Sequence, residues 1–240
     1  MINVNCLNNI ASVGLDLFSS DYNTNAAYED AQAVLVRSAK MHDMELSDDL
    51  LAIARAGAGV NNIPVDKCVE QGICVFNTPG ANANAVKELV ICGLFLASRK
   101  ISDAMTWAQT LKGEGDMVGK LVEKGKSQFA GPEIMGKTLG IIGLGAIGRG
   151  VAKIAESFGC KVIYYSASGH TYDVPYERVE FDEILAQSDI LSIHAPLNQN
   201  TENLMNKAAF EKMKNSAILI NVGRGPIVND ADLVAALNEN

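Results

Sequence analysis

The sequence lacks an excess of positive charge and has no long apolar run. Its 240 residues include 28 Asp and Glu but only 20 Lys and Arg, which gives a formal net charge of -8 at pH 7. Such an acid excess argues against nucleic acid or an anionic membrane as the main partner. The longest apolar stretch, Leu89–Ser98, is too short to span a bilayer, because a spanning helix needs about 20 residues. We therefore expect neither a nucleic acid nor a membrane as partner.

Cysteine is sparse, and its spacing shows no metal-binding pattern. The five cysteines are Cys6, Cys68, Cys74, Cys92 and Cys160. Most of them lie in or beside apolar runs, so we interpret them as buried, reduced thiols of a cytoplasmic protein without a metal site. The first residues, MINVNCLNNI, also lack the basic start and apolar stretch of a secretory signal peptide.

Apolar runs alternate with helical patterns over the first third of the sequence. We predict strands at Ala33–Val36, Ile53–Ala56 and Ile73–Phe76, and a turn and helix at Asn61–Gly72. Pro64 suits a first helical position, and Gly72 suits a helix end. This alternation of strand and helix indicates an α/β fold with a parallel sheet.

A second series of strands and helices begins at Lys137. The predicted strands are Leu139–Ile142, Lys161–Tyr165, Ile190–Ile193 and Ala217–Asn221, and the predicted helices are Ile147–Phe158, Phe181–Gln187, Lys207–Met213 and Asp230–Leu237. A long helix with one apolar face is predicted at Asn82–Lys100. The Gly- and Lys-rich stretch Leu111–Glu133 is interpreted as a connection between two domains.

The segment from Gly143 to Gly148, GLGAIG, has the GxGxxG spacing of a dinucleotide-binding turn. A predicted strand precedes it and a predicted helix follows it, as the motif requires. Gly143 would allow the tight turn, Gly145 would let the backbone approach a pyrophosphate, and Gly148 would let the helix pack on the strand. The N–H groups at the helix N-terminus would then bind the phosphates. The alternative is a purely structural glycine turn.

One part of the dinucleotide fingerprint is missing. An acidic residue about 20 positions beyond the glycines normally binds the ribose hydroxyls of NAD. Ser166 occupies this position. A serine can hydrogen-bond a ribose hydroxyl but does not repel the 2′-phosphate of NADP, and no arginine follows it to bind that phosphate. NAD is therefore the expected cofactor, with NADP as the alternative.

Two further strand ends carry polar side chains. His194 follows a predicted strand, and histidine titrates near neutral pH, but no acidic partner is visible. This favours a loop residue that lines a pocket through its backbone over a catalytic histidine. Arg224 follows the last predicted strand and has a glycine on each side. A guanidinium at such a strand end can bind a carboxylate with two hydrogen bonds, unless it is a solvated surface arginine.

Three segments together make the sequence similar to the D-isomer-specific 2-hydroxyacid dehydrogenase family. They are TLGIIGLGAIGR, SDILSIHAPLNQNTENLMN and MKNSAILINVGRGPIVN, and RAGAGVNNIPVD and NTPGANANAVKEL also match. The resemblance implies a flavodoxin-like substrate domain over residues 1–85. It also implies a Rossmann NAD-binding domain, incomplete at its C-terminal end, over residues 86–240. A homodimer or higher homo-oligomer is implied as well.

The resemblance also assigns roles to individual residues. Toward the cofactor, Ala146 and Ile147 would contact the pyrophosphate, Ser166 would replace the ribose-binding acid, His194, Ala195 and Pro196 would line the adenine end, and Val222 and Gly223 would lie beside the nicotinamide. Toward the substrate, Arg224 would bind the carboxylate and the carbonyl oxygen, and Ala58, Gly59 and Val60 would offer backbone N–H groups to the carboxylate. The candidates for binding a substrate phosphate are Arg37, Lys40 and Arg55, unless these are solvated charges at strand ends.

Within the family, the likeness is greatest to members that oxidise 3-phospho-D-glycerate with NAD, the first step of L-serine biosynthesis. VRSAK, RAGAGVNNI and FNTPGANANAVKEL carry this likeness. The family's catalytic glutamate and histidine lie downstream of the Arg224 motif, so the sequence is expected to be truncated before them and inactive alone. The alternatives are a reductase of glyoxylate or hydroxypyruvate, a non-enzymatic dinucleotide sensor resembling a corepressor, and an inert fragment.

Overall fold

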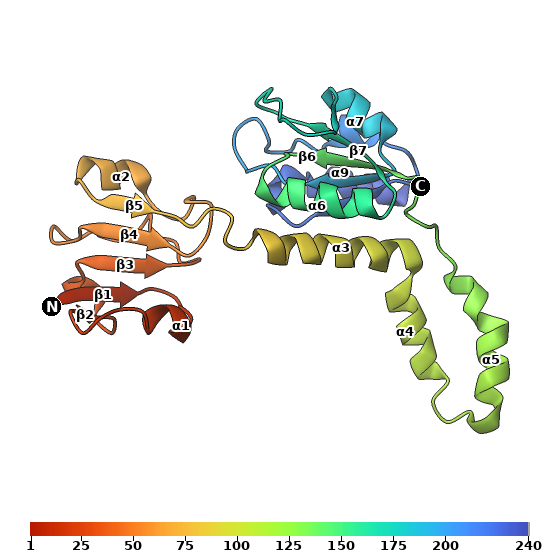
Figure 1. Cartoon of the computed structure of the whole chain (residues 1–240), viewed down its shortest axis with the longest axis horizontal. Helices are drawn as coiled ribbons and strands as arrows, with labels where there is room; N and C mark the ends of the chain where they lie inside the picture. Colours follow the sequence, from red (N-terminus) through yellow and green to blue (C-terminus); the bar gives the residue numbers. More distant parts are fainter. Residues whose placement is uncertain (240) are drawn as a thin grey trace. The chain divides into compact units, whose positions relative to one another are not determined.

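A computed structural model describes residues 1–239, which form two compact units. The first unit is Met1–Asn82, and the second begins at Ala83 (Figure 1). Within the described residues, each unit is built on its own five-stranded sheet, and every strand pair in both sheets is parallel. The α/β class predicted from the alternation of strands and helices is therefore confirmed.

The first unit has the strand order β2-β1-β3-β4-β5. Its strands are β1 (Ile2–Cys6), β2 (Tyr22–Asn23), β3 (Ala33–Val36), β4 (Ala52–Arg55) and β5 (Cys74–Phe76), and its helices are α1 (Ser12–Leu15), the 3-10 turn η1 (Tyr28–Asp30) and α2 (Val65–Glu70). This order is the flavodoxin-like one, as the resemblance implies. Buried Val34 and Val36 of β3, Ile53 of β4 and Cys68 of α2 form much of the core.

The second unit has the strand order β10-β9-β6-β7-β8. These strands are β6 (Thr138–Ile142), β7 (Lys161–Tyr165), β8 (Glu177–Arg178), β9 (Ile190–Ile193) and β10 (Ile218–Asn221). Counted from β6, the order matches five positions of the six-stranded Rossmann sheet. After β8 the chain crosses to the other side of β6, so the strand order reverses between β6 and β9. Open α/β sheets bind their ligands at such a reversal.

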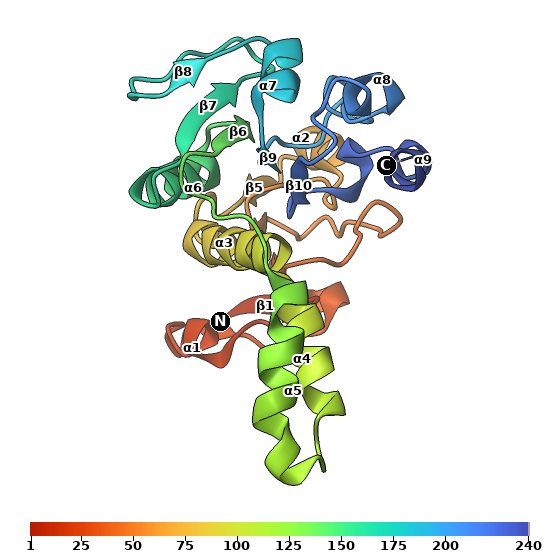
Figure 2. The same ribbon diagram turned by 90° about the vertical axis from the view of Figure 1, so that its right-hand side faces the viewer.

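Helices cover both faces of the second sheet (Figure 2). They are α3 (Ala83–Arg99) and α6 (Ala146–Ser157) on one face, and α7 (Phe181–Gln187), α8 (Lys207–Phe210) and α9 (Asp230–Asn238) on the other. Successive residues of a strand point to opposite faces. Accordingly, Leu139 and Ile141 of β6 pack with the first group of helices, whereas Ile142 packs with the second. Burial on both sides explains why these strands are continuous apolar runs.

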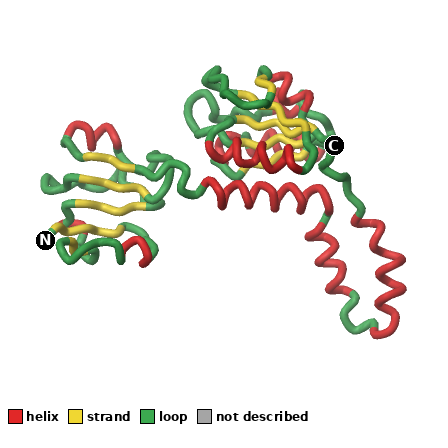
Figure 3. The backbone as a smooth tube through the Cα atoms, viewed as in Figure 1, coloured by secondary structure: helices red, strands yellow, loops and turns green. Residues whose placement is uncertain are grey.

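The interpretation of residues 111–133 as a connection between two domains is wrong. These residues lie inside the second unit and contribute to a helical hairpin (Figure 3). Its elements are α4 (Ile101–Thr110), the 3-10 turns η2 (Gly115–Met117) and η3 (Lys126–Phe129), and α5 (Val118–Gly125). The glycines of α5 lower its helix propensity, but tertiary packing overrides that. The Trp107 ring centroid lies 5.1 Å from that of Phe129, and a side chain at Gly125 would collide with the Trp107 ring.

The prediction that the cysteines are buried is wrong for two of the five. Cys68 and Cys160 are buried and Cys6 is half-buried, and burial raises the pKa of all three thiols. Cys74 and Cys92 are exposed, because Cys74 lies on the edge strand β5 and Cys92 on the outer side of α3. An apolar neighbourhood in sequence therefore did not guarantee a buried position in these elements.

Neither a metal cluster nor a membrane-spanning helix is present in the described part of the chain. No three His, Cys, Asp or Glu side chains of residues 1–239 come together in a way that could hold a metal ion. None of the helices among these residues is long and apolar enough to cross a membrane.

Candidate functional site

The carboxyl ends of four neighbouring strands lie along one edge of the second sheet. Strand pairing places Ile142 of β6 beside both Tyr165 of β7 and Ile193 of β9, and Ile193 beside Asn221 of β10. The residues that follow these strand ends are therefore neighbours too. They are the Gly143 turn, Ser166, the segment from His194 to Pro196, and the segment from Val222 to Arg224. The structure thus gathers the predicted cofactor residues and Arg224 at the point where the strand order reverses.

The three motif glycines have three different environments. Gly143 has a positive φ of 92°, and a Cβ atom there would lie 2.8 Å from the backbone nitrogen of Ala195. A Cβ atom at Gly148 would collide with the Gly143 carbonyl oxygen and would lie 3.1 Å from Ile141 Cγ2. A Cβ atom at Gly145 would have no neighbour within 4 Å. Gly143 and Gly148 are therefore required by the protein's own packing, whereas Gly145 faces open space.

The N-terminus of α6 presents backbone donors beside this open space. Gly145 is the N-cap residue of α6, and no side chain caps the helix. The first N–H groups of an α-helix have no partner within the helix, and they favour a negative charge in front of them. Exposed Ala146 and half-buried Ile147 form the first turn. The absence of a Cβ atom at Gly145 and the uncapped turn together fit a dinucleotide pyrophosphate.

Ser166 occupies the position where a ribose-binding acid was sought. It follows β7, is only 6 % exposed, and its Oγ lies 3.2 Å from Ser168 Oγ. A cation does approach the loop after β7, but from another element: the Arg149 guanidinium of α6 lies 5.6 Å from the Tyr172 ring centroid. The His170 ring contacts the same tyrosine, with centroids 4.4 Å apart. Sequence reasoning missed Arg149 because only the tertiary fold brings α6 to this loop.

His194 is held as a neutral side chain after β9. Its Nε2 lies 2.9 Å from Ser192 Oγ, and its backbone N–H donates to the Ile142 carbonyl of β6 at 2.8 Å. Burial lowers the pKa of His194 to about 4. The hydrogen-bond partner is a hydroxyl rather than a carboxylate, so this contact brings no negative charge that would favour the protonated imidazole. This environment supports the pocket-lining interpretation of His194 over a catalytic one.

Arg224 lies in a turn that an unpredicted residue, Asn221, holds in place. Asn221 Oδ1 accepts a hydrogen bond from the Gly223 N–H at 3.1 Å, and Asn221 Nδ2 donates to the Arg224 carbonyl at 3.1 Å. The Arg224 side chain is exposed, and no carboxylate of residues 1–239 forms an ion pair with it. The sequence did carry a signal for this turn. Asn221 ends an apolar strand and precedes Val-Gly, and an asparagine side chain often accepts from the backbone N–H two residues on.

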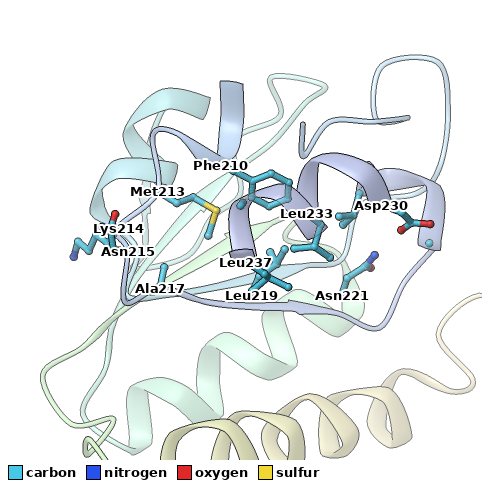
Figure 4. A pocket seen from close by; sticks show the side chains of 13 residues that line it. Phe210, Met213, Lys214, Asn215, Ala217, Leu219, Asn221, Asp230, Leu233 and Leu237 are labelled. Carbon is cyan, nitrogen blue, oxygen red and sulfur yellow. The ribbon is translucent and has the colours of Figure 1, made fainter. Parts of the chain in front are cut away.

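An apolar pocket of about 570 Å³ lies between β10, α9 and the segment around α8. Figure 4 shows Phe210, Met213, Leu219, Leu233 and Leu237 lining it, with Asn221 and Asp230 at one end and Lys214 and Asn215 at the other. β10 is the edge strand of the described sheet on this side. The pocket therefore adjoins the Arg224 turn but presents mostly hydrocarbon to any occupant.

In the first unit, the loop after β4 has its peptide groups oriented by three donors. The carbonyl of Gly57 accepts from the Thr78 N–H at 3.0 Å, that of Ala58 accepts from Asn77 Nδ2 at 2.6 Å, and that of Gly59 accepts from Arg55 Nη1. In a trans peptide, the C=O and the following N–H point in opposite directions. No peptide bond of the described chain is cis. The N–H groups of Ala58, Gly59 and Val60 are therefore directed away from these donors.

These three N–H groups have no acceptor among residues 1–239, which leaves them available to a ligand. Successive backbone N–H groups that point outward from a loop form an anion-binding concavity. A carboxylate is the kind of group that such a loop binds. The predicted substrate residues Ala58, Gly59 and Val60 thus have a geometry suited to that role.

The three basic residues proposed for a phosphate differ in their surroundings. Arg37 and Lys40 are exposed in the loop after β3. Arg55 is half-buried, and besides the Gly59 carbonyl it donates from Nε to the Arg37 carbonyl at 3.1 Å. The β3 loop itself is fixed by Asn8, whose Oδ1 accepts from the N–H groups of Arg37, Ser38 and Ala39 at 2.8, 2.9 and 3.0 Å. Asn8 was not predicted, since nothing local in the sequence indicates a contact across 29 residues.

Comparison with protein families gives one direct match. Residues 92–240 match the family described as D-isomer specific 2-hydroxyacid dehydrogenase, NAD binding domain. The matched segment begins within α3 and contains the glycine turn, His194 and Arg224.

Similar sequences and structures agree with this match. A hydroxypyruvate reductase of Thermotoga maritima is 40% identical over 191 residues, which cover 79% of this chain and 58% of that protein. A D-3-phosphoglycerate dehydrogenase of Mycobacterium leprae is 36% identical over 220 residues, which cover 88% of this chain and 39% of that protein. The crystal structure of a glyoxylate reductase from Paecilomyes thermophila superposes with a TM-score of 0.78 at 26% identity, over 99% of this chain and 78% of that one. The chain thus spans little more than half the length of the first of these proteins and less than half the length of the second.

Proposed function

The chain belongs to the D-isomer-specific 2-hydroxyacid dehydrogenase family, and from that membership we propose that it serves the NAD-dependent oxidation of 3-phospho-D-glycerate to 3-phosphohydroxypyruvate. One observation carries the choice of substrate. Strands β3 and β4 are neighbours, and the loop after β4, whose Ala58, Gly59 and Val60 N–H groups have no acceptor among residues 1–239, lies next to a loop that carries exposed Arg37 and Lys40. The substrate has one carboxylate and one phosphate, and these two loops offer a binding element for each.

The second unit is the family's NAD-binding domain, and its residues fit the cofactor. Ala146 and Ile147 in the uncapped first turn of α6 would bind the pyrophosphate, and Gly145 leaves room for it. Ser166 would hydrogen-bond the adenosine ribose in place of an acid. The segment from His194 to Pro196 would line the adenine end, and Val222 and Gly223 would lie beside the nicotinamide. Bound NAD would supply the hydride acceptor for the oxidation.

The protein's own part of the chemistry is to bind and orient the acid. Arg224 would hold the substrate carboxylate with two parallel hydrogen bonds and would stabilise charge that develops on the carbonyl oxygen. Its guanidinium is exposed, and the Asn221 side chain fixes the turn from which it projects. In the first unit, the N–H groups of Ala58, Gly59 and Val60 would bind the carboxylate through the backbone.

Reduction of hydroxypyruvate or glyoxylate is the second candidate function. Two observations favour it: the 40% identical relative from Thermotoga maritima is a hydroxypyruvate reductase, and the Arg55 side chain is engaged with carbonyl groups of its own unit. Neither hydroxypyruvate nor glyoxylate carries a phosphate, so Arg37 and Lys40 would have no partner in either acid. A non-enzymatic dinucleotide sensor would use the same cofactor residues but would show no affinity for either acid.

Calorimetric titration distinguishes these functions without requiring turnover. The NADH-saturated chain is titrated with 3-phosphohydroxypyruvate and with hydroxypyruvate. We expect the phosphorylated acid to bind about tenfold more tightly or better, since each charge-assisted hydrogen bond to the phosphate contributes about 1.5–3 kcal/mol. Equal affinities would replace the proposed substrate with hydroxypyruvate. Absence of binding by both acids would favour the sensor or an inert chain.

We also propose that two copies of the chain associate through the α4–α5 hairpin. Met105, Met117 and Val118 of this hairpin are 65%, 48% and 36% exposed, so the hairpin offers apolar side chains that a second copy could cover. Sedimentation equilibrium of the wild type and of Met105→Lys tests this. We expect a dimer that the substitution weakens, and a wild-type monomer would refute the proposal.

A further inference from the structure

The orientation of the substrate-binding loop depends on three side-chain and backbone donors. We name Arg55, Asn77 and Thr78 the carbonyl clamp, because they donate to the carbonyl groups of Gly59, Ala58 and Gly57, respectively. Each donor fixes the direction of one carbonyl. Because the peptides are trans, each held carbonyl turns the next N–H away from the donor. Three consecutive donors thus act on three consecutive peptide groups.

We infer that Arg55 is a positioning residue for the substrate carboxylate rather than a ligand of the substrate phosphate. The inference rests on the proposed function in one respect, that the outward N–H groups bind the carboxylate. Arg55 would act through the backbone of Gly59 and Val60. It would therefore matter equally for a phosphorylated and an unphosphorylated acid, whereas a phosphate ligand would matter only for the first.

The surroundings of Arg55 support a structural use of its guanidinium. Two of its nitrogens donate to carbonyls of different loops, Nε to Arg37 and Nη1 to Gly59. The side chain thus ties the β3 loop to the β4 loop. A Cβ atom at Gly57 would lie 3.1 Å from Arg55 Nη1, so the absence of a side chain at Gly57 leaves room for the Arg55 guanidinium. Only arginine offers several donors in one rigid plane, which suits this bridge between two carbonyls.

The other two members of the clamp come from the segment after β5. Asn77 Nδ2 reaches the Ala58 carbonyl at 2.6 Å, and the Thr78 hydroxyl donates to the Arg55 carbonyl at 3.4 Å in addition to the backbone bond to Gly57. The β5 segment therefore supports both the loop and the residue that orients it. This gives Asn77 the same expected role as Arg55, with no charge involved.

The first test measures the order of the loop in the ligand-free chain. Backbone ¹⁵N relaxation is recorded for Ala58, Gly59 and Val60 in the wild type, Arg55→Ala, Asn77→Ala and Lys67→Ala. Lys67→Ala is the matched control, because Lys67 Nζ also donates to a carbonyl of this unit, that of His42 at 3.2 Å, but from α2. We expect order parameters near 0.85 in the wild type and the control, and below about 0.6 in the two clamp variants. Unchanged order in Arg55→Ala would overturn the inference.

The second test measures ligand affinity through the same amide signals. Hydroxypyruvate and 3-phosphohydroxypyruvate are titrated separately into the wild type and Arg55→Ala. We expect the dissociation constants of both acids to rise about tenfold, so that their ratio stays the same. A rise confined to 3-phosphohydroxypyruvate would overturn the inference and make Arg55 a phosphate ligand. If neither acid moves the wild-type amide signals, the proposed function fails, and the relaxation experiment still decides whether Arg55 positions the loop. The dispersion of the remaining amide signals shows whether each variant is folded.

Discussion

Gly143 lies so close to Ala195 that a Cβ atom on the glycine would come within 2.8 Å of the alanine backbone nitrogen. The turn after β6 is thus packed directly against the chain leaving β9. The positive φ of Gly143 adds a second reason for glycine at this position.

Replacing Gly143 should therefore destabilise the fold itself. Gly143→Ala is expected to lower the free energy of unfolding by about 1–3 kcal/mol, because it combines left-handed strain with a backbone collision. Urea unfolding followed by circular dichroism measures the change. Gly113→Ala is the matched control, since Gly113 also has a positive φ, 101°, but a Cβ atom there would have no neighbour within 4 Å. An equal loss in both variants would show that strain alone, without the Ala195 contact, sets the cost.

Replacing Gly145 should instead affect only the cofactor. Its φ of -74° suits any residue, and a Cβ atom there would meet no protein atom within 4 Å. Gly145→Val is expected to weaken NADH binding by about tenfold or more while the unfolding midpoint in urea stays unchanged, because the side chain would occupy the path of the pyrophosphate. Fluorescence titration with NADH measures the affinity. Unchanged affinity would mean that the open space in front of α6 is not the pyrophosphate site.

The ribose end of the cofactor site should be tunable at Ser166. We expect the wild type to bind NADH more tightly than NADPH. Ser166→Asp should widen that preference by about tenfold or more, since a carboxylate repels the 2′-phosphate. Both cofactors are titrated by fluorescence into both proteins. A wild type that binds the two equally would indicate that Arg149 and His170 near Tyr172 compensate for the missing acid.

His194 should make the fold sensitive to acid. Burial lowers its folded-state pKa to about 4, below the value of about 6.5 in an unfolded chain. Between these two values the unfolded state binds more protons, so stability must fall as the pH is lowered from 7 toward 4. We expect the wild type to lose about 2 kcal/mol more than His194→Gln between about pH 7 and about pH 5. Urea unfolding at the two pH values tests this, and parallel losses would show that His194 is not the group responsible.

The 240-residue chain should bind its cofactor but should not turn over substrate. Hydride transfer from a 2-hydroxy acid needs a base for the hydroxyl proton, and no histidine of residues 1–239 is hydrogen-bonded to a carboxylate. His194, the histidine at the strand ends, is kept neutral by burial and paired with Ser192. The assay uses 3-phospho-D-glycerate and NAD at alkaline pH, with NADH absorbance as readout. A rate of about 1 per second or faster would show that another group accepts the proton.

Much of the fold could be predicted because its signals are local. The apolar strands and the helices between them in the second unit follow from continuous apolar runs and helical periodicity, and the glycine spacing indicated the turn at Gly143. The helix α5 was missed because its glycines lower the helix propensity of the segment. The hairpin depends on the packing of Trp107 against Phe129 and Gly125, which only the structure shows. The very short strands β2 and β8 carry too few residues for any periodicity.

The candidate site residues could be proposed from the sequence, but the side chains that support them could not. A strand end and its flanking glycines indicated Arg224, and the family resemblance indicated the loop around Ala58. The side chains that fix the loops of the first unit come from elsewhere. Asn8, which accepts a hydrogen bond from the Arg37 N–H in the β3 loop, is 29 residues from Arg37, and Asn77 is 19 residues from Ala58, whose carbonyl accepts from it. A basic side chain such as Arg55 also looks the same in sequence whether it binds a phosphate or a peptide carbonyl. Such supports depend on tertiary distances, which no local pattern records.

The carbonyl clamp has an electrostatic consequence for a chain whose formal net charge is -8. The N–H groups of Ala58, Gly59 and Val60, directed away from the donors of the clamp, would offer a positive potential to a ligand without placing an ionised side chain against it. At long range the net negative charge of the chain repels an anionic acid, and at contact range these N–H groups attract it together with Arg37, Lys40 and Arg224. Dissolved salt shortens the reach of the repulsion, to about 8 Å at physiological ionic strength, and acts much less on the contact itself. Added salt should therefore weaken the contribution of exposed Arg37, Lys40 and Arg224 to substrate binding more than the contribution of the backbone N–H groups.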